Sequence, residues 1–254
     1  MPAGANGSRP VGNSGARHYL SGMSALSPYS IDPARSLRRA LSRALVAGLL
    51  AIAAARPAAA QMRVPLGDRV IALDAAGYAR GNAKAAVWIV EFADFGCGYC
   101  EKFWRETLPV LDSLYVNRGR AYWKFVPFTI GMFPNSGAAA LGSICAAEQG
   151  KFFAMHDILY DRRKEWMKST DARAQVARYA TTVKLDAGRF AACVRSPRAA
   201  QQLAMNNALA QTLRIRGTPT FFINGETIPG ALPTDIFVRG MNAVLAEAEG
   251  KKAR

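Results

Sequence analysis

Two cysteines separated by two residues, Cys97 and Cys100, follow an apolar segment and could carry redox chemistry. Residues 88–90 favour a strand, Gly96 allows a turn, and apolar residues recur at helical spacing from Cys97 to Leu114. A strand would therefore deliver Cys97 to a helix N-terminus, where unpaired N–H groups and the helix dipole stabilise a thiolate. Because Cys100 lies one turn further on the same face, we predict Cys97 as the attacking thiol and Cys100 as the resolving thiol.

A carboxylate, Glu91, interrupts the apolar strand six residues before Cys97. Burial there would raise its pKa and let it accept the proton of the resolving thiol, so we predict a catalytic role. The alternative is that Glu91 points to solvent at the edge of a sheet.

Two motifs give the chain a family resemblance. The first is F-x-D-F-x-C-x-Y-C at residues 92–100, and the second is G-T-P-T-F-F-I-N-G at residues 217–225. Together they resemble the thioredoxin-fold thiol:disulfide oxidoreductases of the DsbA class, over about residues 65 to 250. The resemblance implies an α/β thioredoxin fold with an inserted all-helical subdomain.

The resemblance also implies roles for the residues of both motifs. In the family the downstream proline is cis and faces the C-x-x-C, which implies the same for Pro219, an uncommon geometry for an X-Pro bond. Substrate chains would lie extended beside Thr218 and Pro219, near the intervening dipeptide Gly98 and Tyr99.

Composition divides the chain into four parts. We expect a disordered N-terminal extension plus signal peptide over 1–60, the first part of the thioredoxin fold over 61–130, the helical insertion over 131–214 and the second part of the fold over 215–254. The insertion is alanine-rich and helically periodic, with Asp186 and Ser196 as N-caps.

The N-terminal part has the order of an export signal. A positive segment at 35–43, an apolar run at 45–55 and Ala58-Ala59-Ala60 precede Gln61, so we predict cleavage near Ala60 and a periplasmic or extracytoplasmic protein. The run is shorter than the roughly twenty residues of a membrane span, which makes a permanent anchor the weaker alternative. The Arg38-Arg39 pair leaves twin-arginine export open.

The remaining two of the four cysteines, Cys145 and Cys193, lie in predicted helices of the insertion. In an exported chain we predict a structural disulfide between them, closing a loop of about 50 residues. The alternative is two buried free thiols.

Outside the insertion the pattern predicts further strands and a closing helix. Residues 70–73 are expected as an edge strand leading to the central strand at 86–93, with 121–128 as its parallel neighbour. Asn224-Gly225 predicts a hairpin, and 233–248 a final helix. We expect Lys124 to face solvent rather than to raise the positive potential near the cysteines. We expect His156 to make a local contact with Asp157 rather than to act in catalysis.

We therefore predict an exported thiol:disulfide oxidoreductase, without cofactor or metal, whose partners are unfolded or partly folded cysteine-containing exported proteins and a membrane redox partner. We favour dithiol oxidation, and the alternative is an isomerase or reductase. Gly98-Tyr99 and Thr218 resemble the corresponding residues of DsbC-type isomerases and support the alternative. Residues 61–85 are too short for the dimerisation domain of those isomerases, which argues against it. A zinc half-site at the two motif cysteines and a non-catalytic chaperone-like module are remoter alternatives. The formal net charge is +15, but the sequence has no basic stretch interleaved with aromatic residues, which argues against nucleic-acid binding.

Overall fold

The computed structural model describes residues 62–252, so the predicted extension, signal peptide and cleavage site lie outside the described residues. Its strands are β1 (Arg63–Leu66), β2 (Arg69–Ala72), β3 (Tyr78–Gly81), β4 (Val87–Ala93), β5 (Ala121–Pro127), β6 (Thr220–Ile223) and β7 (Glu226–Pro229). Its helices are α2 (Gly98–Glu106), α3 (Leu108–Leu111), the π-helical turn η1 (Asp112–Val116), α4 (Ser136–Ala147), α5 (Phe152–Asp161), α6 (Arg163–Met167), α7 (Ala172–Thr182), α8 (Ala187–Arg195), α9 (Pro197–Thr212) and α10 (Thr234–Lys252).

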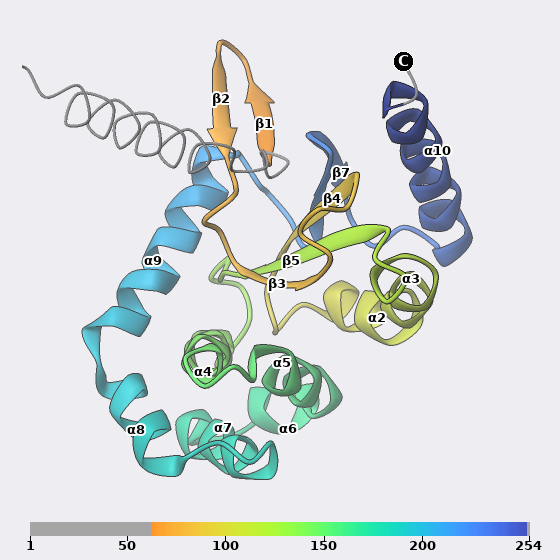
Figure 1. Cartoon of the computed structure of the whole chain (residues 1–254). Helices are drawn as coiled ribbons and strands as arrows, with labels where there is room; N and C mark the ends of the chain where they lie inside the picture. The colour runs from red at the N-terminus through yellow and green to blue at the C-terminus, as the bar shows by residue number, and fades with distance from the viewer. Residues whose placement is uncertain (1–61, 253–254) are drawn as a thin grey trace, which may run out of the picture. The chain divides into compact units, whose positions relative to one another are not determined.

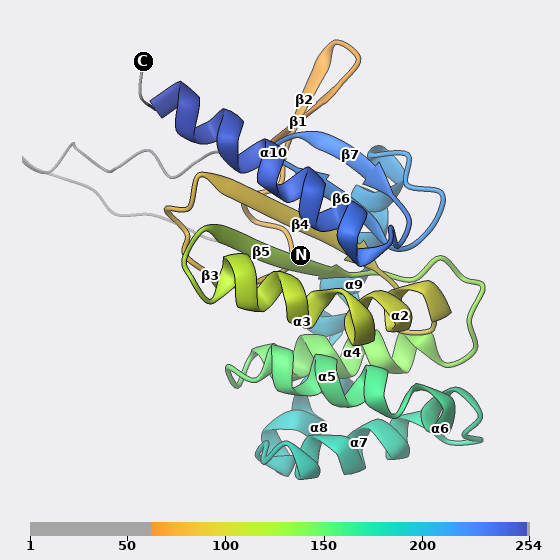
Figure 2. The same ribbon diagram turned by 90° about the vertical axis from the view of Figure 1, so that its right-hand side faces the viewer.

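The central sheet has the order β3-β5-β4-β6-β7 (Figures 1 and 2). Strands β4 and β5 are parallel, as the strand-helix-strand pattern predicts, whereas β3, β6 and β7 run antiparallel to their neighbours. The predicted hairpin joins β6 to β7, and both Asn224 and Gly225 adopt positive φ, as a tight hairpin turn requires.

Strand β4 is the centre of the fold because every one of its residues is buried. Side chains alternate between its two faces. Val87 and Ile89 share a cluster with α2, α3 and α10, whereas Trp88 and Val90 pack in another cluster with the end of α9. Figure 2 accordingly shows α2, α3 and α10 on the near side of the sheet and α9 behind it.

Helices α4 to α9 form the predicted helical subdomain between β5 and β6. Asp186 and Ser196 cap α8 and α9 as expected, each accepting a backbone N–H at the start of its helix. The sulfur atoms of Cys145 on α4 and Cys193 on α8 are bonded at 2.09 Å. The α/β thioredoxin fold with an inserted helical subdomain is thus confirmed.

The predicted edge strand at residues 70–73 is not part of the main sheet. Residues 70–73 were expected as an edge strand of the main sheet, but β2 pairs with β1 in a separate two-stranded sheet. The edge strand next to β5 is β3, for which the sequence pattern predicted no strand. Gly77 permits this, since a Cβ there would lie 2.3 Å from the carbonyl oxygen of Phe125.

The expectation that Lys124 faces solvent is wrong. Its side chain is 4% exposed, because the segment after β2 covers this face of β5. Its ammonium donates to the carbonyl oxygens of Leu73 and Asp74 and so satisfies the buried charge with backbone acceptors.

Candidate active site

A buried carboxylate organises the turn between β4 and α2. Asp94 accepts the N–H of Gly96 at 2.8 Å and that of Ile130 at 3.1 Å, and its carbonyl accepts the N–H of Cys97 at 3.0 Å. Burial raises the pKa of Asp94. The sequence motif includes Asp94 but gave it no role; its function is to hold the two loops together at the cysteine.

Cys97 occupies the N-cap of α2, and Cys100 lies in the first turn. Both are buried free thiols in this structure. The Cys97 Sγ lies 3.3 Å from the carbonyl oxygen of Thr218, to which the protonated thiol donates, across 121 residues of sequence. The Thr218–Pro219 peptide bond is cis and Pro219 is buried, so the two motifs meet at one site.

The two thiols have opposite acidities. Hydrogen bonding from the Cys100 thiol, followed by a hydrogen bond with Thr218 and by the backbone N–H groups of Cys100 and Tyr99, lowers the pKa of Cys97 to about 6 against an opposing effect of burial. Burial raises the pKa of Cys100 well above its ordinary value, and the charges of Cys97 and Glu91 add to this. At neutral pH Cys97 is therefore the thiolate and Cys100 the thiol.

Glu91 is 2% exposed, which places it inside the sheet rather than at a solvent-facing edge. Burial raises its pKa to about 8, although the charge of Arg80 and a hydrogen bond with Trp123 act to lower it. Its Oε2 atom has no hydrogen-bond partner within the described chain. The charge of Glu91 is one of the smaller causes that raise the pKa of Cys100.

Arg163, from α6 of the helical subdomain, was not predicted as a site residue. Its Nε donates to Glu101 Oε2 at 2.6 Å and its Nη1 to the carbonyl oxygen of Gly96 at 2.8 Å. It therefore joins α6 to both the turn before Cys97 and the first turn of α2. No local pattern distinguishes Arg163 from its neighbour Arg162, so sequence alone carried no signal for it.

Two large apolar side chains are exposed in the C-x-x-C and in the loop after β5. Tyr99 of the C-x-x-C is 69% exposed, and Met132 in the loop after β5 is 75% exposed. Next to Met132, Phe133 packs so closely on Gly96 that a Cβ there would lie 2.3 Å from the Phe133 Cβ. Gly98 has an open environment, with Arg163 Nη2 at 3.7 Å from the position of a Cβ.

His156 is in the local contact that its sequence position suggested. Its Nδ1 lies 2.8 Å from Asp157 Oδ1, which also accepts the Trp104 indole N–H at 3.0 Å. Burial lowers the pKa of His156. The ring packs among aromatic side chains, including Phe125 and Tyr160, and so belongs to the core behind the cysteines.

The zinc half-site gains no second pair of ligands from Cys145 and Cys193, because these two cysteines are bonded to each other. Across residues 62–252 no group of three or more His, Cys, Asp or Glu side chains is arranged to hold a metal ion.

A protein-family model described as thioredoxin matches residues 74–241, so this chain belongs to the thioredoxin family. Within the described part of the chain, no helix has the length and apolar character needed to cross a membrane.

Three known proteins illustrate the likeness. The chain is 33% identical over 174 residues to Na(+)/H(+) antiporter NhaA 3 of Salinispora tropica, covering 67% of this chain and 25% of the antiporter. It is 28% identical over 151 residues to the probable disulfide bond formation protein D of Bacillus cereus, covering 58% of this chain and 69% of that protein. The crystal structure of Wolbachia pipientis alpha-DsbA1 superposes with a TM-score of 0.62 at 21% identity, covering 74% of this chain and 96% of that one.

The Wolbachia structure confirms, at the level of the fold, the likeness to DsbA proteins that the two motifs indicated. The sequence match to the antiporter spans only about a quarter of the antiporter's length.

Proposed function

We propose that this protein is an exported thiol:disulfide oxidoreductase that exchanges a Cys97–Cys100 disulfide with cysteines of other proteins, chiefly oxidising them. The observation that carries the proposal is the asymmetry of the two thiols, with the pKa of Cys97 lowered to about 6 and that of Cys100 raised by burial. The name of the Bacillus cereus relative, a probable disulfide bond formation protein, supports the same chemistry.

In the oxidising direction, a substrate thiolate attacks the Cys97 sulfur of the disulfide, and Cys100 leaves with the bonding electron pair. Cys100 takes up a proton because its pKa is high. A second substrate thiolate then attacks the substrate sulfur of the mixed disulfide and releases Cys97 as a thiolate. The substrate loses two electrons, which the cysteine pair gains.

The low pKa of Cys97 favours this direction because it makes Cys97 a good leaving group and stabilises the reduced pair. Glu91 is suited to move the proton of Cys100, since a pKa of about 8 makes both of its protonation states accessible near neutral pH. We assign it this role in both directions of the reaction.

A hollow of ≈ 310 Å³ beside the cis peptide bond offers a place for the substrate chain. It is lined by Thr218 and Pro219 together with the loop before them and the end of β7. An extended segment here would pair with the backbone near Thr218 and bring its cysteine to Cys97, with Tyr99 and Met132 as flanking apolar contacts.

The alternative is an isomerase or reductase. It is favoured by one feature, the Gly98-Tyr99 dipeptide followed far downstream by Thr218, which resembles disulfide isomerases of the DsbC type.

Export is part of the proposal. It rests on the signal-like order of residues 35–60 and on the Cys145–Cys193 bond, because structural disulfides persist mainly outside the cytosol. A membrane partner would return the reduced pair to the disulfide after each round.

The test is oxidation of a reduced, unfolded ribonuclease by the oxidised protein from Gln61 onward. We expect reactivation of the ribonuclease, its loss in Cys97→Ser, and a trapped mixed disulfide at Cys97 in Cys100→Ser. A Cys145→Ala/Cys193→Ala variant is the control and should retain the exchange reaction. Full activity in Cys97→Ser would instead support the non-catalytic chaperone-like module.

A further inference from the structure

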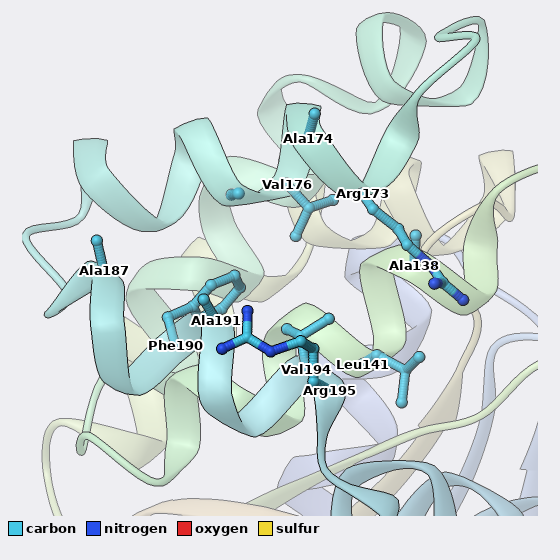
Figure 3. Close-up of a pocket in the computed structure, with 11 residues that line it drawn as sticks. Ala138, Leu141, Arg173, Ala174, Val176, Ala187, Phe190, Ala191, Val194 and Arg195 are labelled. Carbon is cyan, nitrogen blue, oxygen red and sulfur yellow. The ribbon is translucent and has the colours of Figure 1, made fainter.

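The helical subdomain contains a second cavity that shares no residue with the candidate active site. It has a volume of ≈ 260 Å³ and lies between α4, α7 and α8 (Figure 3). Its lining is formed mainly by alanines and larger apolar side chains, among them Leu141, Val176, Phe190 and Ala191.

The interior of this cavity is apolar. Val176 and Phe190 are buried side chains at its wall, and most of the remaining lining is alanine, whose short side chains leave the space open. An apolar cavity of about 150 Å³ already accommodates a benzene-sized molecule, so this one has room for a larger apolar group.

Two packing features fix the walls relative to one another. The Cys145–Cys193 disulfide ties α4 to α8 one turn from Leu141 and directly beside Val194. Helix α7 meets α4 where Val176 Cγ1 lies 2.3 Å from the position a Cβ on Gly142 would occupy, so glycine permits this close approach. The cavity is therefore preformed rather than dependent on a rearrangement.

Two arginines line the cavity, Arg173 from α7 and Arg195 from α8, and their side chains extend in opposite directions (Figure 3). Both are exposed residues, and within residues 62–252 neither guanidinium has an ion pair or hydrogen bond. No acidic residue lines the cavity. By contrast, the neighbouring Arg198 pairs with Glu148 and Arg178 bonds to Gln175.

We propose that this cavity binds a small organic carboxylate with an apolar tail, such as a medium-chain fatty acid. The tail would occupy the space between the helices, and the carboxylate would accept hydrogen bonds from the guanidinium group at one end of the cavity, that of Arg173 or that of Arg195. Guanidinium groups suit this partner because their N–H groups match the geometry of a carboxylate.

The charge of the subdomain favours the same class of ligand. Residues 136–212 carry 11 lysines and arginines against 6 aspartates and glutamates, so an anion is attracted to it at long range.

The experiment is calorimetric titration of the protein from Gln61 onward with decanoate, below the concentration at which decanoate forms micelles. We expect saturable binding of one decanoate, at least about tenfold weaker in Arg173→Gln/Arg195→Gln, because charge-assisted hydrogen bonds are lost. Lys164→Gln, which removes a positive charge elsewhere in the subdomain, should bind like the wild type.

Two further comparisons test the position of the tail. Ala191→Leu fills the cavity and should abolish binding, whereas Ala192→Leu, an exposed neighbour on the same helix, should not. Decanol, without the charge, and acetate, without the tail, should each bind at least about tenfold more weakly than decanoate.

The proposal is overturned if decanoate does not bind, if decanol binds equally well, or if the double arginine variant binds like the wild type. Since both arginines are exposed, that variant keeps the test valid even where Ala191→Leu disturbs folding.

Discussion

Glu91 is a carboxyl group inside the central strand, and its ionisation is linked to the stability of the fold. The folded pKa of about 8 lies above the ordinary value of 4.5. The folded chain therefore binds more protons than the unfolded chain between these two values, and the free energy of unfolding falls as the pH rises through this window.

Replacement of Glu91 by glutamine should remove this pH dependence. At pH 5 the variant and the wild type should have similar free energies of unfolding, because the wild-type carboxyl is then protonated in the folded chain. At pH 8.5 the variant should be more stable, by an amount on the order of a few kcal/mol. Denaturant unfolding at both pH values measures this.

The control is Glu106→Gln, an exposed carboxylate of α2. It should follow the wild-type profile. An unchanged pH profile in Glu91→Gln would show that Glu91 is not the titrating buried group.

At the scale of elements, the sequence predicted the type of most helices and strands but not how they pair or dock. The apolar run of β4 and the turn signal Asn224-Gly225 are local, and both were interpreted correctly. Strand β3 was missed because its stability comes from pairing with β5, which no local pattern reports. The burial of Lys124 likewise depends on a distant segment that covers it.

The docking of α7 on α4 depends on a single glycine. In Gly142→Ala the new Cβ would lie 2.3 Å from Val176 Cγ1, so the Val176 side chain or one of the two helices must shift. We expect a loss of about 1–3 kcal/mol in the free energy of unfolding, measured by denaturant titration. Gly137→Ala in the same helix has open space around it and should be neutral or stabilising by up to about 1 kcal/mol. Equal effects of the two changes would contradict this account of the packing.

Arg163 fastens the helical subdomain to the active-site turn. Its ion pair with Glu101 is largely buried, with 17% and 15% of the two side chains exposed. Arg163→Gln should therefore cost about 1–3 kcal/mol at pH 7. Although burial acts to raise it, the pKa of Glu101 is lowered by the hydrogen bonds from Arg163 and Arg105. The loss should thus shrink as the pH falls below about 4.5 and Glu101 is protonated.

The matched control is Arg162→Gln, whose ion pairs with Asp161 and Glu165 are on the surface. Its unfolding midpoint should stay close to that of the wild type. The assignment of Arg163 fails if both variants unfold alike at pH 7.

At the scale of the whole molecule, the active site is assembled from parts that lie far apart in the sequence. Cys97 meets the Thr218 carbonyl across 121 residues, and the subdomain inserted between them contributes Arg163. The two motifs could be assigned to one site in advance because the family resemblance relates them. Arg163 could not, because its role depends on where α6 docks rather than on any motif of its own.

The same assembly explains why the cysteines differ. Cys97 lies at the N-terminus of α2 and receives hydrogen bonds, whereas Cys100 is fully enclosed between the sheet and the subdomain. The sequence predicted the low pKa of Cys97 from its place at a helix N-terminus. It could not predict the extent of burial that keeps Cys100 protonated.

The measurement that tests the proposed oxidation most directly is the equilibrium reduction potential of the Cys97–Cys100 pair in a glutathione buffer, for the protein from Gln61 onward. The stabilised Cys97 thiolate predicts an oxidising couple, with a potential nearer to about −120 mV than to about −270 mV. A value near the lower figure would contradict dithiol oxidation and favour a reductant, and a pair unable to cycle between thiols and disulfide would contradict the oxidoreductase itself.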